Sequence, residues 1–82
     1  MIQLALYTRP GCHLCEEMKA VVERVGRTVP IALEEIDISG NVELEARYGV
    51  EIPVLTIEGR KAAKYRIDEA ALRRMLLGRF SR

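Results

Sequence analysis

Chemically reactive side chains are scarce in this 82-residue chain. It has two cysteines, Cys12 and Cys15, one histidine, His13, and no tryptophan. Two cysteines cannot form the several disulfides that stabilise small secreted domains. These three side chains together also cannot supply the four ligands of a closed zinc site within one chain. The sequence therefore predicts neither a disulfide-rich scaffold nor a structural zinc domain.

An excess of charge of one sign is also missing. Thirteen Lys and Arg residues stand against 12 Asp and Glu residues, which gives a net charge of +1. We therefore expect no nucleic-acid partner and no acidic membrane partner. No segment approaches the ~20 apolar residues of a membrane span. Residues 1–7 have no basic region and too short an apolar run for a signal peptide. We expect a cytoplasmic protein.

The remaining composition is that of an ordinary globular domain. Hydrophobic residues make up 49% of the chain and charged residues 30%, which argues against disorder. We expect residues 1–82 to form a single domain and the protein to be a monomer.

Hydrophobic periodicity predicts an α/β fold in the order βαβαββα. The predicted strands are residues 2–7, 31–38, 53–58 and 61–66, and the predicted helices are 12–27, 41–48 and a last one capped by Asp68. Glu34 and Glu35 interrupt the alternation of the second strand, which predicts a bulge or a strand that begins near Leu33. The last helix carries an apolar stripe, Ala71, Leu72, Met75 and Leu76. The first two strands should be parallel, joined by a right-handed crossover, and the last two should form a hairpin.

The two cysteines lie three residues apart at the start of the first helix. Backbone N–H groups and the helix dipole favour a thiolate at Cys12. Cys15 lies one turn later, in register with Met18 and Val22, so it should face inward. This arrangement predicts thiol–disulfide exchange, in which Cys12 attacks a substrate disulfide and Cys15 then resolves the mixed disulfide. In a reducing compartment, Cys-x-x-Cys is more often redox-active or metal-binding than a permanent crosslink.

Three segments, residues 7–15, 35–38 and 48–55, resemble glutaredoxins and their relatives in the thioredoxin-fold superfamily. The likeness covers nearly the whole chain. It implies a thioredoxin-like fold, with a four-stranded mixed sheet flanked by three helices. It also implies that Cys12 is the nucleophile and Cys15 the resolving thiol. The resemblance further implies that a cis bond precedes Pro53, which faces the cysteines. Ile52 would then offer backbone groups to a bound peptide or to glutathione.

The chain departs from glutaredoxins in several places. It has His13 and Leu14 between the cysteines, where those proteins usually carry Pro-Tyr. It also lacks their Gly-Gly pair before the last helix, although Asp68 is present. In this respect it is more similar to the small, poorly characterised glutaredoxin-like proteins that keep Cys-x-x-Cys. Arg9 matches a basic residue that contacts glutathione in the family, or it is a solvated arginine. His13 either stabilises the Cys12 thiolate or is simply exposed.

The leading hypothesis is a thiol–disulfide oxidoreductase with no bound cofactor. Its partners would be a disulfide-containing protein or small molecule and a reductant, either glutathione as co-substrate or a thioredoxin-reductase system. A second hypothesis is a module that handles copper or zinc through the same cysteines. Pro10, where copper chaperones usually carry Met, and the C-terminal helix weigh against this hypothesis. A third is a shared iron–sulfur cluster. Tyr7, Tyr48 and Tyr65 either line a substrate groove or pack as core and rim residues.

Overall fold

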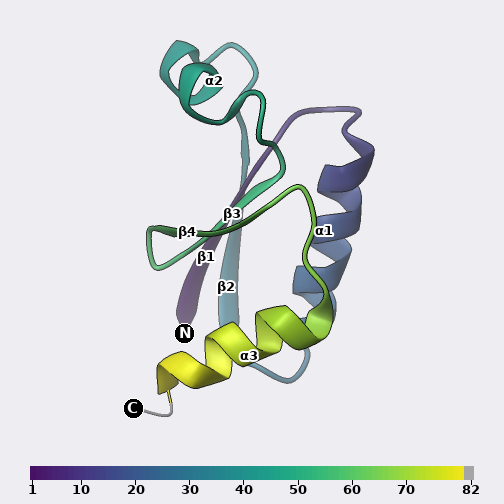
Figure 1. The fold of residues 1–82 in the computed structure, drawn as a ribbon, viewed down its shortest axis with the longest axis vertical. Coiled ribbons are helices and arrows are strands. Elements are labelled where there is room, and N and C mark those ends of the chain that lie inside the picture. Colours follow the sequence, from purple (N-terminus) through teal and green to yellow (C-terminus); the bar gives the residue numbers. More distant parts are fainter. Residues whose placement is uncertain (81–82) are drawn as a thin grey trace.

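Four strands and three helices occur within residues 1–80, the part of the chain that the computed structural model describes (Figure 1). They follow one another in the predicted order βαβαββα. The elements are β1 (Ile2–Thr8), α1 (His13–Val25), β2 (Ile31–Asp37), α2 (Val42–Tyr48), β3 (Val54–Ile57), β4 (Arg60–Lys64) and α3 (Glu69–Phe80). None of these helices is long and apolar enough to cross a membrane.

The strands form one mixed sheet in the order β2-β1-β3-β4. Strand β1 is parallel to β2 and antiparallel to β3, and β3 and β4 form an antiparallel hairpin. The expected parallel crossover and hairpin are therefore confirmed. The charged strand β4 lies at one edge of the sheet, as its lysines suggested.

The prediction of a bulge or late start in β2 is wrong. The register of β1 and β2 is continuous from Ile2 opposite Ile31 to Thr8 opposite Asp37. Glu35 pairs with the core residue Leu6 and so faces α1, where its carboxylate lies 3.0 Å from Lys19 Nζ. Because β2 lies at the edge of the sheet, the Glu35 carboxylate can extend to the surface. The side chains of β2 therefore still alternate between the two faces of the sheet. The irregularity of the sheet lies instead in the β3–β4 pairing, between residues 55 and 56.

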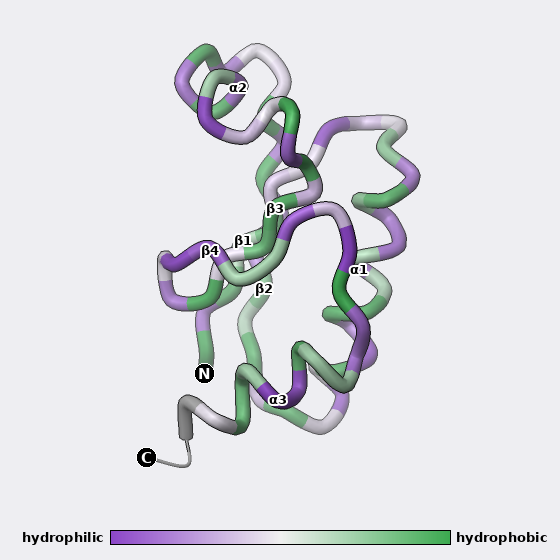
Figure 2. The backbone as a smooth tube through the Cα atoms, viewed as in Figure 1, coloured by the Kyte–Doolittle hydropathy of each residue, from purple (hydrophilic) through white to green (hydrophobic). Residues whose placement is uncertain are grey.

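The main core lies between one face of the sheet and helices α1 and α3. It includes Leu6 of β1, Met18 and Val22 of α1, and Leu72 and Leu76 of α3. Along α1, hydrophobic and hydrophilic residues alternate as expected for a helix with one buried face (Figure 2). The predicted stripe of α3 is narrower than expected. Leu72 and Leu76 are fully buried, but Met75 is 39% exposed.

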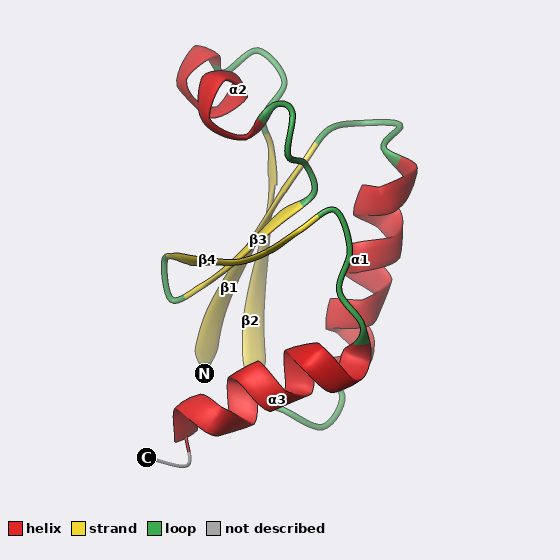
Figure 3. Cartoon of the chain, in the orientation of Figure 1, coloured by secondary structure: helices red, strands yellow, loops and turns green. Residues whose placement is uncertain are grey.

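A second, smaller core lies on the opposite face of the sheet. It consists of Ile38, Tyr48 and Val54, and the rings of Tyr7 and Tyr48 lie 4.4 Å apart. Tyr7 has the opposite parity to Leu6 along β1, so the two side chains point to opposite faces. Helix α2 covers this second core and stands at the end of the sheet away from α3 (Figure 3).

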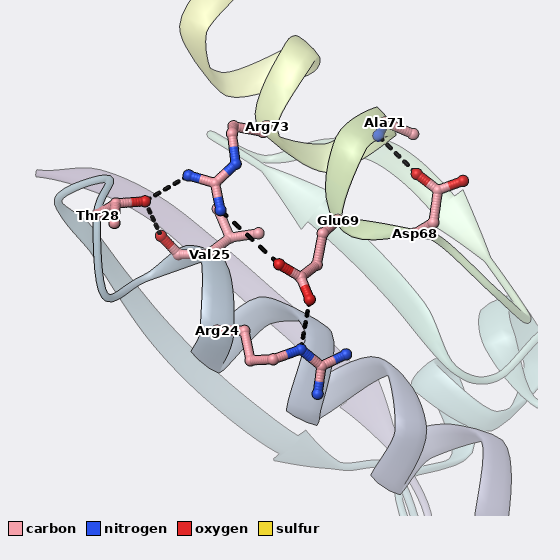
Figure 4. Close-up of polar contacts among 7 residues, drawn as sticks. All are labelled: Arg24, Val25, Thr28, Asp68, Glu69, Ala71 and Arg73. Carbon is pink, nitrogen blue, oxygen red and sulfur yellow. Dashed lines mark hydrogen bonds and ion pairs between the residues drawn. The ribbon is translucent and has the colours of Figure 1, made fainter.

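Polar side chains complete the helix ends and the α1–α3 interface. The predicted caps are confirmed: Asn41 Oδ1 accepts the N–H of Leu44, and Asp68 Oδ1 accepts the N–H of Ala71. Glu69 accepts a hydrogen bond of 2.5 Å from Arg24 Nε, which joins the start of α3 to the last turn of α1 (Figure 4). The side chains of Arg24 and Glu69 are both partly exposed, whereas Leu72 and Leu76 of α3 are buried.

Candidate active site

The site begins where β1 ends at Thr8 and the chain turns into α1. Gly11 has φ = +78° in this turn, a conformation that glycine adopts without strain. Cys12 follows in an extended conformation as the N-cap of α1, and its N–H donates to the carbonyl of Arg9 at 3.2 Å. The helix therefore starts at His13, one residue later than predicted. Cys12 is thus held at the positive end of the α1 dipole.

Cys12 and Cys15 are joined by a disulfide across the first turn of α1. The backbone N–H of Cys15 donates to Cys12 Sγ at 3.1 Å. Cys12 is partly exposed, whereas Cys15 is buried with 3% exposure. The same N–H is placed to stabilise a Cys12 thiolate after reduction. The two sulfurs thus differ in accessibility and in hydrogen bonding, as the sequence predicted.

A groove of about 290 Å³ opens beside the disulfide. Its walls come from the end of β1, the first turns of α1 and the end of β2, and its lining residues are Thr8, Arg9, Pro10, Cys12, Cys15, Glu16, Lys19, Glu35 and Asp37. The hydrogen bond from Lys19 to Glu35 raises the pKa of Lys19. The backbone N–H of Ser39 donates to Asp37 and lowers the pKa of that carboxyl. The groove therefore presents fixed charges of both signs next to the cysteines.

Arg9 and His13 each pair with the carboxylate of a glutamate. Arg9 lines the groove, and its guanidinium forms an ion pair with Glu45 of α2. His13 is highly exposed, and its Nε2 lies 2.8 Å from a carboxylate oxygen of Glu17 one turn later. Arg9 thus lies beside the cysteines, while the imidazole of His13 is bound on the outer surface of α1.

The peptide bond between Ile52 and Pro53 is cis, as the resemblance implied. Pro53 is buried, and its carbonyl accepts the N–H of Tyr65 at 2.8 Å. Within residues 1–80, the backbone N–H and C=O of Ile52 form no hydrogen bond. Neither Ile52 nor Pro53 lines the groove that contains the cysteines.

The cysteine pair offers two candidate metal ligands. No group of three or more His, Cys, Asp or Glu side chains among the described residues could hold a metal ion. Cys12 and Cys15 would supply two thiolates only after reduction of their disulfide.

The model of the family described as "Glutaredoxin-like domain (DUF836)" matches residues 3–77. The chain belongs to this glutaredoxin-like family. A glutaredoxin-like protein from Dictyostelium discoideum is 35% identical over 77 residues, which cover 87% of this chain and 71% of that protein. An uncharacterized protein from Mycobacterium tuberculosis is 29% identical over 76 residues, which cover 87% of this chain and 78% of that protein.

Solved structures share the fold of this glutaredoxin-like domain. A structural-genomics target protein from X. campestris is 32% identical with a TM-score of 0.78, and the match covers 92% of this chain and 96% of that one. A protein from Nitrosomonas europaea is 33% identical with a TM-score of 0.77, covering 96% and 89%. A mutant thioredoxin from Halobacterium salinarum is 27% identical with a TM-score of 0.69, covering 94% and 73%. The four-stranded sheet and three helices are therefore a thioredoxin-like fold.

The sequence left open whether Tyr65 lines a substrate groove or packs as a core or rim residue, and neither alternative predicted its contact with the segment around the cis proline. Its hydroxyl donates to the carbonyl of Val50 at 3.0 Å, and its side chain is exposed rather than part of a core. Tyr7 and Tyr48, in contrast, pack in the second core of this glutaredoxin-like domain. The missing Gly-Gly pair indicated that the region before α3 differs from that of glutaredoxins. No local pattern, however, predicts that the Tyr65 hydroxyl bonds to a carbonyl 15 residues away.

Proposed function

We propose that this glutaredoxin-like protein is a thiol–disulfide oxidoreductase. The observation that carries the proposal is the Cys12–Cys15 disulfide at the N-terminus of α1, with one sulfur partly exposed and the other buried. An accessible sulfur can meet a substrate, and a shielded neighbour can then displace it. The hydrogen bond from Cys15 N–H to Cys12 Sγ favours Cys12 as the thiolate.

The reaction takes place in two exchanges. The thiolate of Cys12 attacks one sulfur of a substrate disulfide, which forms a mixed disulfide and releases the other substrate sulfur as a thiolate. Cys15 then loses its proton and attacks Cys12 Sγ, which releases the second substrate thiolate and leaves the Cys12–Cys15 disulfide. The substrate gains two electrons and the dithiol loses two. A thiol reductant, with glutathione as one candidate, returns them by the reverse chemistry.

We propose roles in substrate binding for Ile52 and Arg9. The free backbone groups of Ile52, beside Pro53, are suited to pair with the main chain of a disulfide-containing peptide or of glutathione. Arg9 lines the groove and contributes positive charge there, although its ion pair with Glu45 partly neutralises that charge. A reducing compartment such as the cytoplasm would supply the thiol that regenerates the dithiol.

Two single-cysteine variants test the proposal. Reduced Cys15→Ser protein should accumulate a mixed disulfide on Cys12 with a disulfide substrate, because the resolving thiol is missing. Cys12→Ser is the matched control and should form no such adduct, since Cys15 is buried. Mass spectrometry of the intact proteins identifies the adducts. Trapping on Cys15 instead of Cys12, or no reversible Cys12–Cys15 disulfide in glutathione buffers of any ratio, would contradict the proposal.

A further inference from the structure

Tyr65 binds the chain on both sides of Ile52. Its backbone N–H donates to the carbonyl of Pro53 at 2.8 Å, and its side-chain hydroxyl donates to the carbonyl of Val50 at 3.0 Å. Ile52 lies between these two carbonyls in sequence, and its own N–H and C=O form no hydrogen bond within the described residues. Tyr65 therefore restrains the chain on both sides of Ile52, at residues 50 and 53, and leaves the backbone groups of Ile52 available.

The backbone of Tyr65 is unusual for a bulky residue. β4 ends at Lys64, and Tyr65 has φ = +69° as the chain leaves the strand. Side chains with a Cβ are disfavoured in this left-handed region, and glycine adopts it freely. Backbone strain of this kind is found where surrounding contacts maintain it, often at functional sites. Here the two hydrogen bonds to residues 50 and 53 are the contacts that maintain it.

A second restraint acts on the same segment from β4. The carboxylate of Glu51 lies 2.5 Å from Lys61 Nζ and 3.8 Å from Lys64 Nζ. The N–H of Glu51 also donates to the carbonyl of Tyr48 at 2.8 Å. Residues 50, 51 and 53 thus each form a hydrogen bond or ion pair that restrains the segment on either side of Ile52.

We propose that Tyr65 is a positioning residue for peptide substrates. It holds residues 50–53 so that the Ile52 N–H and C=O are aligned to pair with the extended main chain that flanks a substrate disulfide. This inference rests on the proposed oxidoreductase function and adds a substrate class to it: disulfides within a peptide main chain. A prearranged strand end binds an extended peptide more tightly because less conformational entropy is lost on binding.

The test compares two disulfide substrates with the full-length, reduced protein. One is an extended peptide whose central cysteine is linked to a small fluorescent thiol, and the other is bis(hydroxyethyl) disulfide, which has no peptide main chain. Tyr65→Phe removes only the hydroxyl bond to Val50. We expect the KM for the peptide to rise about three- to tenfold, while kcat for the peptide and the rate with bis(hydroxyethyl) disulfide stay unchanged.

Two further variants separate positioning from stability. Thr28→Val is the matched control, since it removes a hydroxyl that bonds to Val25 and Arg73 at the opposite end of α1 from Cys12, and it should leave both substrates unaffected. Tyr65→Gly removes the hydroxyl and relieves the left-handed backbone, so a raised peptide KM in this variant cannot be caused by strain.

The outcomes decide between the inference and the function on which it rests. A peptide KM that is unchanged in Tyr65→Phe, or equal slowing with both substrates, overturns the positioning role while leaving the oxidoreductase function intact. Wild-type protein that reduces neither substrate overturns the proposed function itself, and the inference with it. A selective rise in the peptide KM supports both.

Discussion

Replacing Leu76 by alanine tests which contacts hold α3 against α1. Leu76 is fully buried in the main core, and truncation of a buried leucine to alanine costs about 2–5 kcal/mol. The Arg24–Glu69 ion pair joins the same two helices, but its side chains are 46% and 41% exposed. Such a pair contributes about 0.2–1 kcal/mol. We therefore expect Leu76→Ala to destabilise the protein several times more than Glu69→Gln.

The expected loss is large for a chain of this size. Stability of about 0.05–0.15 kcal/mol per residue gives about 4–12 kcal/mol for a protein of 82 residues. A loss of about 3 kcal/mol would therefore remove a quarter or more of the total. With a urea dependence of about 1 kcal/mol/M, the unfolding midpoint should fall by about 3 M.

Urea unfolding of the oxidised proteins, followed by far-UV circular dichroism, measures these differences. Met75→Ala is the matched control, because Met75 lies on the adjacent position of α3 but is 39% exposed. It should cost less than about 1 kcal/mol. If Leu76→Ala costs no more than Glu69→Gln or Met75→Ala, the conclusion that buried leucines rather than ion pairs hold α3 is refuted.

Two further predictions concern charged groups near the site. The hydrogen bond from Lys61 lowers the pKa of Glu51 below its ordinary 4.5, so this contact stabilises the fold above pH 4.5 and the contribution is lost as the pH falls through the lowered pKa. Lys61→Met should therefore reduce the drop in stability on acidification, as thermal melts across this pH range would reveal. His13→Ala should leave the pKa of Cys12 unchanged, because the highly exposed imidazole is paired with Glu17 on the outer surface of α1; curves of thiolate absorbance against pH that differ between the two proteins would contradict this.

Local signals were sufficient for most of the secondary structure. The three- and four-residue spacing of Cys15, Met18 and Val22 predicts α1 and its buried face, because a helix has 3.6 residues per turn. Asn41 and Asp68 mark helix starts because a cap bonds to N–H groups only three residues away. These features depend on neighbours in sequence, so they can be predicted from sequence alone.

Predictions that depended on distant partners were less accurate. Glu34 and Glu35 predict a bulge or a late start of the strand, but the strand is unbroken and the carboxylate of Glu35 binds Lys19 of α1. Met75 fits the helical stripe of α3, yet it is 39% exposed. In both cases, periodicity identified the direction of the side chain but not what lies opposite it.

The same division applies to the candidate site. The spacing of Cys12 and Cys15 at a helix start was enough to predict that they lie across one turn, with Cys12 accessible and Cys15 buried. The surroundings of the cysteines depend on tertiary contacts: Arg9 pairs with Glu45 of α2, and Tyr65 binds the chain on both sides of Ile52. The two kinds of contact differ in how far apart their residues lie in the sequence. A helical turn is set by local backbone geometry, whereas contacts between residues 15 or 36 positions apart form only after the sheet and helices have packed.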